Sequence, residues 1–212
     1  MRINRSTPFI ALALLSTLSY CSQPSQEKVT TSTPTEQHEK HKPAMSDGAL
    51  EIKAQPQPDT LKGSLKAEAH GQIGNAHLML TYHSPAVRGR MIWGGLVTYD
   101  QVWVTGAHSA TSLTTDKNLT IGGKPLAAGK YAFFTIPGKE EWTIIINRNW
   151  EQHLADDYSE AEDILRIKVK PELTDQHQER LRYEIISDQK DEGAIIITWD
   201  KLKVRVPMAV AH

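Results

Sequence analysis

Apolar and polar residues alternate along most of the chain from residue 67 onward, with the period of a strand that buries one face. In residues 77–83, HLMLTYH, the side chains of Leu78, Leu80 and Tyr82 fall on one face. Residues 164–170, ILRIKVK, alternate apolar and basic side chains in the same way. The remaining strand-like segments, some of them around glycine or proline turns, are 119–126, 128–147, 181–186, 194–199 and 201–208.

Only one segment has a helical pattern, residues 149–163, and it is short. No long amphipathic helix is therefore available to cover a parallel sheet. The sequence predicts an all-β domain over residues 67–212: an antiparallel β-sandwich of eight or nine strands, jelly-roll-like, with one short helical insertion.

Residues 1–20 differ in composition from this domain and are typical of a secretory signal peptide. Arg2 and Arg5 give a basic start, and the apolar run that follows, PFIALALLSTL, is too short to span a bilayer. Cys21 comes directly afterwards, in LSYCSQPS. The arrangement resembles a bacterial lipoprotein signal, in which the cysteine becomes the lipidated N-terminus, although Tyr20 stands where a small residue is usual.

Residues 21–66 are rich in Ser, Thr, Pro, Gln, Lys and Glu and poor in aromatic residues. Such a segment buries too little apolar area to offset the entropy of ordering it, so we expect a flexible tether behind the lipidated Cys21. The expected location is extracytoplasmic, with the domain anchored to a membrane through its N-terminal lipid.

Charge and cysteine content limit the function further. The formal net charge is −1, which gives no electrostatic reason to expect nucleic acid as a partner. The chain has one cysteine, so no intramolecular disulfide forms and stability must come from the core.

Four longer motifs carry a resemblance to a known family. They are YHSPAVRGRMIWGGLV, VWVTGAHSATS, IGGKPLAAGKYAFFTIPG and EWTIIIN. Through them the chain resembles, from about residue 67 to residue 210, the bacterial family catalogued as domain of unknown function 2911. The resemblance implies a secreted or lipid-anchored β-rich protein with no established activity. After Trp103 that family often has Arg-Thr-Gly-Ala-Asn-Glu, whereas this chain continues with Val104 and reaches His108 and Ser109, so an imidazole replaces a charge pair.

Three histidines stand where predicted elements end or meet. His83 precedes Ser84-Pro85 at a strand end, His108 lies among small residues between two strands, and His153 lies in the helical segment. Asp157 follows His153 by four residues, on the same helical face. Three imidazoles and a carboxylate suit a transition metal such as Zn or Cu. We expect these four residues to share a metal or small ligand at one end of the sandwich; because no local metal motif is present, three unrelated histidines remain the alternative.

A second set of candidates would bind an organic ligand. Arg88 and Arg90 could hold a carboxylate or phosphate with their forked donors, or fix a hairpin turn. Trp103, with Trp93, could stack on a sugar or pack in the core. We predict Arg88, Arg90 and Trp103 as ligand-binding residues, for an unidentified small ligand or envelope component. The alternative functions are a carbohydrate- or peptidoglycan-binding lipoprotein, and a purely structural envelope lipoprotein without metal; the sequence identifies no reaction.

Replacing Cys21 tests the predicted location. The variant Cys21→Ser should move from the membrane fraction to the soluble fraction, because the lipid on the thiol is the expected anchor. Fractionation of cells followed by immunodetection measures this, and a Ser variant that stays with the membranes like the wild type contradicts the lipoprotein interpretation.

Overall fold

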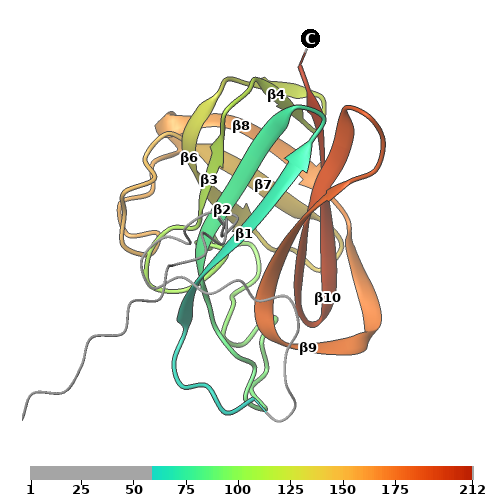
Figure 1. Ribbon diagram of the computed structural model, residues 1–212. Coiled ribbons are helices and arrows are strands. Elements are labelled where there is room, and N and C mark those ends of the chain that lie inside the picture. Colours follow the sequence, from blue (N-terminus) through green and yellow to red (C-terminus); the bar gives the residue numbers. More distant parts are fainter. Residues whose placement is uncertain (1–58, 212) are drawn as a thin grey trace, which may run out of the picture. The chain divides into compact units, whose positions relative to one another are not determined.

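The computed structural model describes residues 59–211, in which strands make up nearly all regular structure (Figure 1). Residues 1–58, which hold the predicted signal peptide, Cys21 and most of the predicted tether, lie outside the described residues, as does His212. No helix within residues 59–211 is long and apolar enough to cross a membrane.

Ten strands in the described part form two antiparallel sheets, so the predicted all-β sandwich is confirmed. The six-stranded sheet has the order β1-β2-β3-β6-β7-β8 and comprises β1 (Leu65–Ile73), β2 (Ala76–Ser84), β3 (Ser112–Thr115), β6 (Gly129–Ile136), β7 (Trp142–Asn147) and β8 (Asp163–Val169). The four-stranded sheet has the order β5-β4-β10-β9 and comprises β4 (Leu119–Ile121), β5 (Lys124–Leu126), β9 (Pro171–Ser187) and β10 (Glu192–Val210). Neighbouring strands of the larger sheet follow chain order, except that β4 and β5 belong to the other sheet. The larger sheet is therefore a meander and does not have the Greek-key strand order of a jelly roll.

A two-residue turn sets the register of the first hairpin. Gly74 has a φ of +55°, a conformation that glycine adopts without a steric penalty, and Ile73 pairs with Ala76 across the turn. Counting back along both strands places Lys66 directly opposite His83. Leu65 and Lys66, which the sequence assigns to the tether, are therefore part of β1 and of the domain.

The main core lies between the sheets and contains the predicted inward face of β2. Four of the five tryptophans form an aromatic cluster that joins this core: Trp142 and Trp199 are buried in it, and Trp93 and Trp103 pack against it. The rings of Trp103 and Trp199 stack 5.8 Å apart at 17°, whereas Trp93 meets its three neighbours edge-on. Trp93 and Trp103 therefore pack against the core, and both remain partly exposed.

The helix predicted over residues 149–163 does not form, apart from one 3-10 turn, η1 (Glu160–Glu162). The reason is long-range pairing: His153 forms an isolated bridge with Ser109, and the backbone N–H of Leu154 donates to the carbonyl of His108 at 2.7 Å. Tertiary pairing of this kind overrides helix propensity. Trp150 and Tyr158 instead pack against a second, smaller core on the outer face of the six-stranded sheet, around Phe134.

Arg180 on β9 is almost fully buried and ties three segments together. Its Nε lies 2.8 Å from Oδ2 of Asp59, and its Nη1 donates to the carbonyls of Gly63 and Ser84 at 2.9 and 3.0 Å. Its Nη2 donates to the carbonyl of Leu61 at 2.6 Å. The start of the domain and the end of β2 are thereby both held on β9.

Replacing Arg180 should be among the most destabilising single changes in the domain. Arg180→Met is expected to lower the free energy of unfolding by about 3–5 kcal/mol, because it leaves the buried carboxylate of Asp59 without its charge partner. The matched control Arg148→Met breaks the exposed pair with Glu162 and should cost about 0–1 kcal/mol. Denaturant unfolding measures both, and similar losses would contradict the role of Arg180.

Candidate functional site

His83 and His108 come together where β2 ends. Their imidazole rings are 5.1 Å apart between centroids and nearly perpendicular, at 83°. The segment that carries His108 approaches β2 closely because Gly106 has no side chain: a Cβ there would lie 2.9 Å from Oγ1 of Thr111 and 3.2 Å from the carbonyl oxygen of His83. The small residues around His108 therefore serve a close approach between two parts of the protein itself.

His153 reaches the same end of the sandwich through the pairing that replaces the predicted helix. Ser109, next to His108, forms the bridge with His153, and the backbone N–H of Ala110 donates to the carbonyl of Gln152 at 3.0 Å. His108 itself has a φ of +64°, in the left-handed region that non-glycine residues rarely adopt. The structure thus gathers all three predicted histidines at one end of the domain.

Two pockets lie on either side of the segment that carries His108, and the predicted site residues are distributed between their walls. The first, which we call the lysine pocket, has a volume of about 400 Å³, and its charged and imidazole side chains are Lys66, His83, Lys130, Glu151 and His153. The second, which we call the arginine pocket, has a volume of about 300 Å³, and its walls include Arg90, Leu96, Trp103, His108, Leu154 and Trp199. The His83–His108 ring contact joins the walls of the two pockets.

The electrostatic setting of His83 favours a neutral ring. Burial lowers the pKa of His83 below its ordinary value of 6.5, and the nearby His108 imidazole and Lys66 ammonium lower it further. Burial is the largest of these causes, because removing the ring from water penalises its charged form. At neutral pH His83 therefore offers the lysine pocket one donor and one acceptor nitrogen.

The predicted metal ligands are only partly brought together. His83 and His108 are close enough to share one ion, since metal–nitrogen bonds are about 2 Å long. Asp157 is exposed and lines neither pocket, and Nδ1 of His153 lies 3.4 Å from Asp156 instead. Residues 59–211 contain no group of three or more His, Cys, Asp and Glu side chains that could hold a metal ion. The four-residue metal site stays a prediction.

The two arginines of the RGR motif make different contacts, and only Arg90 lines a pocket. Nη2 of Arg88 donates to the carbonyl of Leu61 at 2.7 Å, which fixes the start of the domain and leaves this side chain outside both pockets. Arg90 caps its own turn, where Nε donates to the carbonyl of Val87 at 3.1 Å and Nη2 to that of Ala86 at 2.6 Å, and it also lines the arginine pocket with Trp103.

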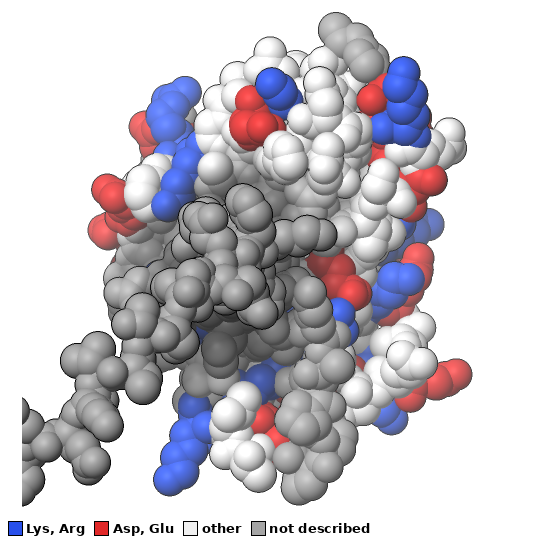
Figure 2. Space-filling model, viewed as in Figure 1, with Lys and Arg blue, Asp and Glu red and all other residues white. Residues whose placement is uncertain are grey.

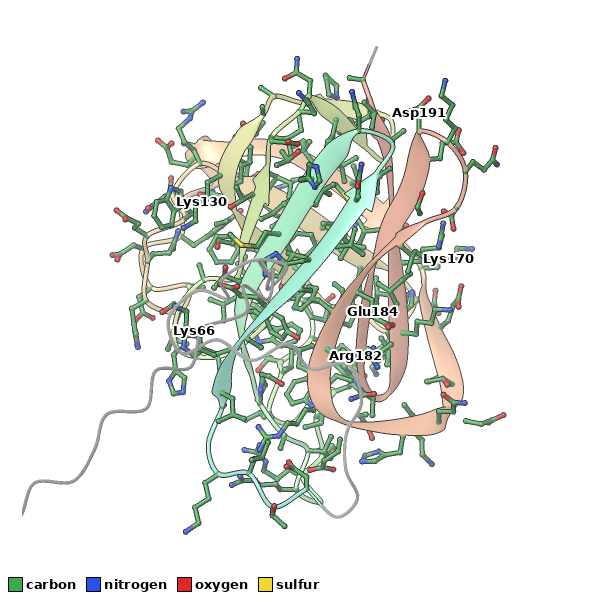
Figure 3. The ribbon with its side chains drawn as sticks, in the orientation of Figure 1. Lys66, Lys130, Lys170, Arg182, Glu184 and Asp191 are labelled. Carbon is green, nitrogen blue, oxygen red and sulfur yellow. The ribbon has the colours of Figure 1, made fainter. Side chains whose placement is uncertain are left out.

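Sequence reasoning missed Lys66, Lys130 and Trp150. Lys130 lies over the ring of Trp150, with Nζ 3.5 Å from the ring centroid, and all three residues line the lysine pocket. Figure 3 shows Lys66 and Lys130 on the same side of the ribbon, one from β1 and the other from β6. One signal was available: the turn at Gly74 and Asn75 sets the register that pairs Lys66 with His83.

The lowered pKa of His83 predicts how stability depends on pH. The unfolded chain binds a proton at His83 near pH 6.5 and the folded chain does not, so acidification through 6.5 toward the folded pKa should destabilise the fold. His83→Gln should therefore lose less stability than the wild type over this window, measured by urea unfolding at a series of pH values. In an NMR titration of His108→Gln, the pKa of His83 should rise but stay below 6.5, because the ring remains buried. Identical curves of stability against pH for the wild type and His83→Gln would contradict this account.

Comparison with known families places the domain. Residues 64–208 match the family described as "Protein of unknown function (DUF2911)", which agrees with the resemblance seen in the motifs. Searches of curated proteins and of solved structures returned no significant match. Since the matched region covers more than half of the 212 residues, the chain belongs to the DUF2911 family.

Proposed function

We propose that the domain binds a small organic anion in the lysine pocket and is carried outside the cytoplasm on a membrane anchor at Cys21. One observation supports the ligand: Lys66 and Lys130 converge with the rings of His83 and His153 on a single pocket. The anchor is supported by the sequence of residues 1–21, which has the layout of a lipoprotein signal.

The charge of the pocket favours an anion. The pocket is lined by two ammonium groups, those of Lys66 and Lys130, and by one carboxylate, that of Glu151, so it has a positive excess without any charge on the two imidazoles. This excess is local, because basic and acidic side chains are interspersed over the visible face of the molecule (Figure 2). A ligand carboxylate about 4 Å from an ammonium gains several kcal/mol at a protein surface before desolvation is subtracted.

The pocket holds Lys130 in place before any ligand arrives. The contact of its ammonium with the Trp150 ring is a cation–π interaction, and Trp150 is packed on the small outer core. A side chain already restricted in this way loses less entropy on binding than a free surface lysine. Hydroxyl groups of Ser109 and Ser112 in the same pocket supply further donors, and a volume of about 400 Å³ lies within the range of small-molecule sites.

A transition metal, Zn or Cu, is the second candidate ligand, and the contact between His83 and His108 favours it. Two imidazoles leave at least two coordination positions to be filled by other groups. Elemental analysis of untagged protein separates the candidates: a stoichiometric metal that is lost in His108→Ala supports the metal, and metal-free protein that binds anions supports the main proposal.

Anion binding can be tested with glutarate, using the neutral glutaramide as the comparison ligand. Lys130→Gln should weaken glutarate binding about tenfold, the loss expected for one ammonium contact of about 1.4 kcal/mol, and should change glutaramide binding little. The matched control Lys124→Gln, in the exposed β4–β5 hairpin, should bind like the wild type. Isothermal titration calorimetry measures all three proteins. Absence of glutarate binding to the wild type, or an equal loss in both variants, would overturn the proposal.

A further inference from the structure

Strained backbone is concentrated around the arginine pocket. Within residues 59–211, six non-glycine residues have a positive φ, and three of them lie in or beside the walls of this pocket: Thr105, His108 and Leu154, with φ of 52°, 64° and 51°. Such conformations cost stability, most of all in a β-branched residue such as Thr105. The surrounding structure holds them in place, since Leu154 donates to the carbonyl of His108, and Tyr183 and Thr111 donate to that of Thr105. Strain that persists in this way is typical of a site whose geometry matters.

Most of the pocket wall is apolar. The stacked rings of Trp103 and Trp199 form part of it, and Leu96 and Leu154, which are 49% and 38% exposed, stand at its edge. Large apolar side chains that border a hollow and remain open to solvent gain from covering by an apolar ligand. A volume of about 300 Å³ is at the small end of ligand sites, so the ligand is the size of one ring or a short alkyl chain.

The polar groups of the pocket favour a carboxylate at one end of that ligand. Arg90 uses two of its five N–H groups to cap the carbonyls of Val87 and Ala86, which orients the guanidinium and leaves three N–H groups without a partner among residues 59–211. His108, on the same pocket, adds an imidazole nitrogen. A guanidinium fork binds a carboxylate through parallel charge-assisted hydrogen bonds. Among the described residues that line this pocket, none has an acidic side chain that would compete for the guanidinium.

We propose that the arginine pocket is a second binding site, for a small apolar carboxylic acid whose ring or chain lies against Trp103 while its carboxylate is bound by Arg90. This pocket is a different hollow from the lysine pocket, although the contact between His83 and His108 joins their walls. The proposal for it does not rest on what the lysine pocket binds. Apolar contact supplies affinity, and the single charged contact supplies orientation and discriminates an acid from its neutral analogue.

Phenylacetate is a suitable probe, because it pairs one ring with one carboxylate, and phenylacetamide is its neutral comparison. Arg90→Gln should weaken phenylacetate binding about tenfold or more and phenylacetamide binding less than about twofold. Leu96→Ser should weaken both ligands, since it removes apolar contact without changing charge. Lys124→Gln, in the exposed β4–β5 hairpin and outside both pockets, should weaken neither. Calorimetry gives the affinities, and near-ultraviolet circular dichroism confirms that each variant is folded.

A measurement on the wild type keeps the test independent of folding, since Arg90 also caps its turn. In ¹H–¹⁵N spectra, phenylacetate should shift the amide signals of His108 and Leu154 more than that of Lys130. Three results would overturn the proposal: no binding of phenylacetate to the wild type, largest shifts at the lysine pocket, or a loss of affinity in Lys130→Gln that exceeds the loss in Arg90→Gln.

Discussion

The buried guanidinium of Arg180 is the constraint on which the candidate site depends. The strand that carries it is held to the end of β2: the hydroxyl of Ser84, the last residue of β2, donates to the carbonyl of Leu181, and the N–H of Leu181 donates to the carbonyl of Pro85. The guanidinium of Arg180 donates to the carbonyl of Ser84, the residue after His83, and its ion pair with Asp59 holds the start of the domain on β9. One buried charge pair thereby fixes the end of β2, from which His83 faces one pocket and the RGR turn leads to the other.

The two pockets differ in how they treat charge, although they share a wall. The imidazoles of His83 and His108 are in contact, and the ordinary cost of placing two positive rings side by side is avoided because burial already disfavours protonation of His83. Positive charge is instead supplied by Lys66 and Lys130 in the lysine pocket and by Arg90 in the arginine pocket. The charged side chains of each pocket are supported by neighbouring groups, an aromatic ring under Lys130 and two carbonyls at Arg90.

Local patterning predicted the parts of the fold that depend on local chemistry. The inward face of β2 and the glycine turn between β4 and β5 form as the alternation and the Gly122-Gly123 pair indicate, because strand period and turn geometry are encoded within a few residues. The segment around His153 was predicted as a helix, since its local composition carries no sign that residue 109 will pair with it. Long-range pairing of this kind also decides which side chains share a pocket. The sequence therefore allowed the prediction that His83, His108 and His153 lie at one end of the domain. It did not allow the prediction that His83 and His153 line one pocket and His108 the other.

The left-handed residues around the arginine pocket bear on how this protein could be engineered. Glycine adopts that conformation freely, so glycine at positions 108 and 154 is the exchange that the backbone angles alone would suggest to an engineer who seeks heat resistance. Each exchange would relieve backbone strain and at the same time remove a side chain that forms the wall of the hollow. Such a variant should bind less whatever its melting temperature, because relief of strain is opposed by the larger entropy of an unfolded chain with glycine and, at position 154, by the loss of apolar contact. The melting temperature is therefore a poor guide to which residues this domain can spare.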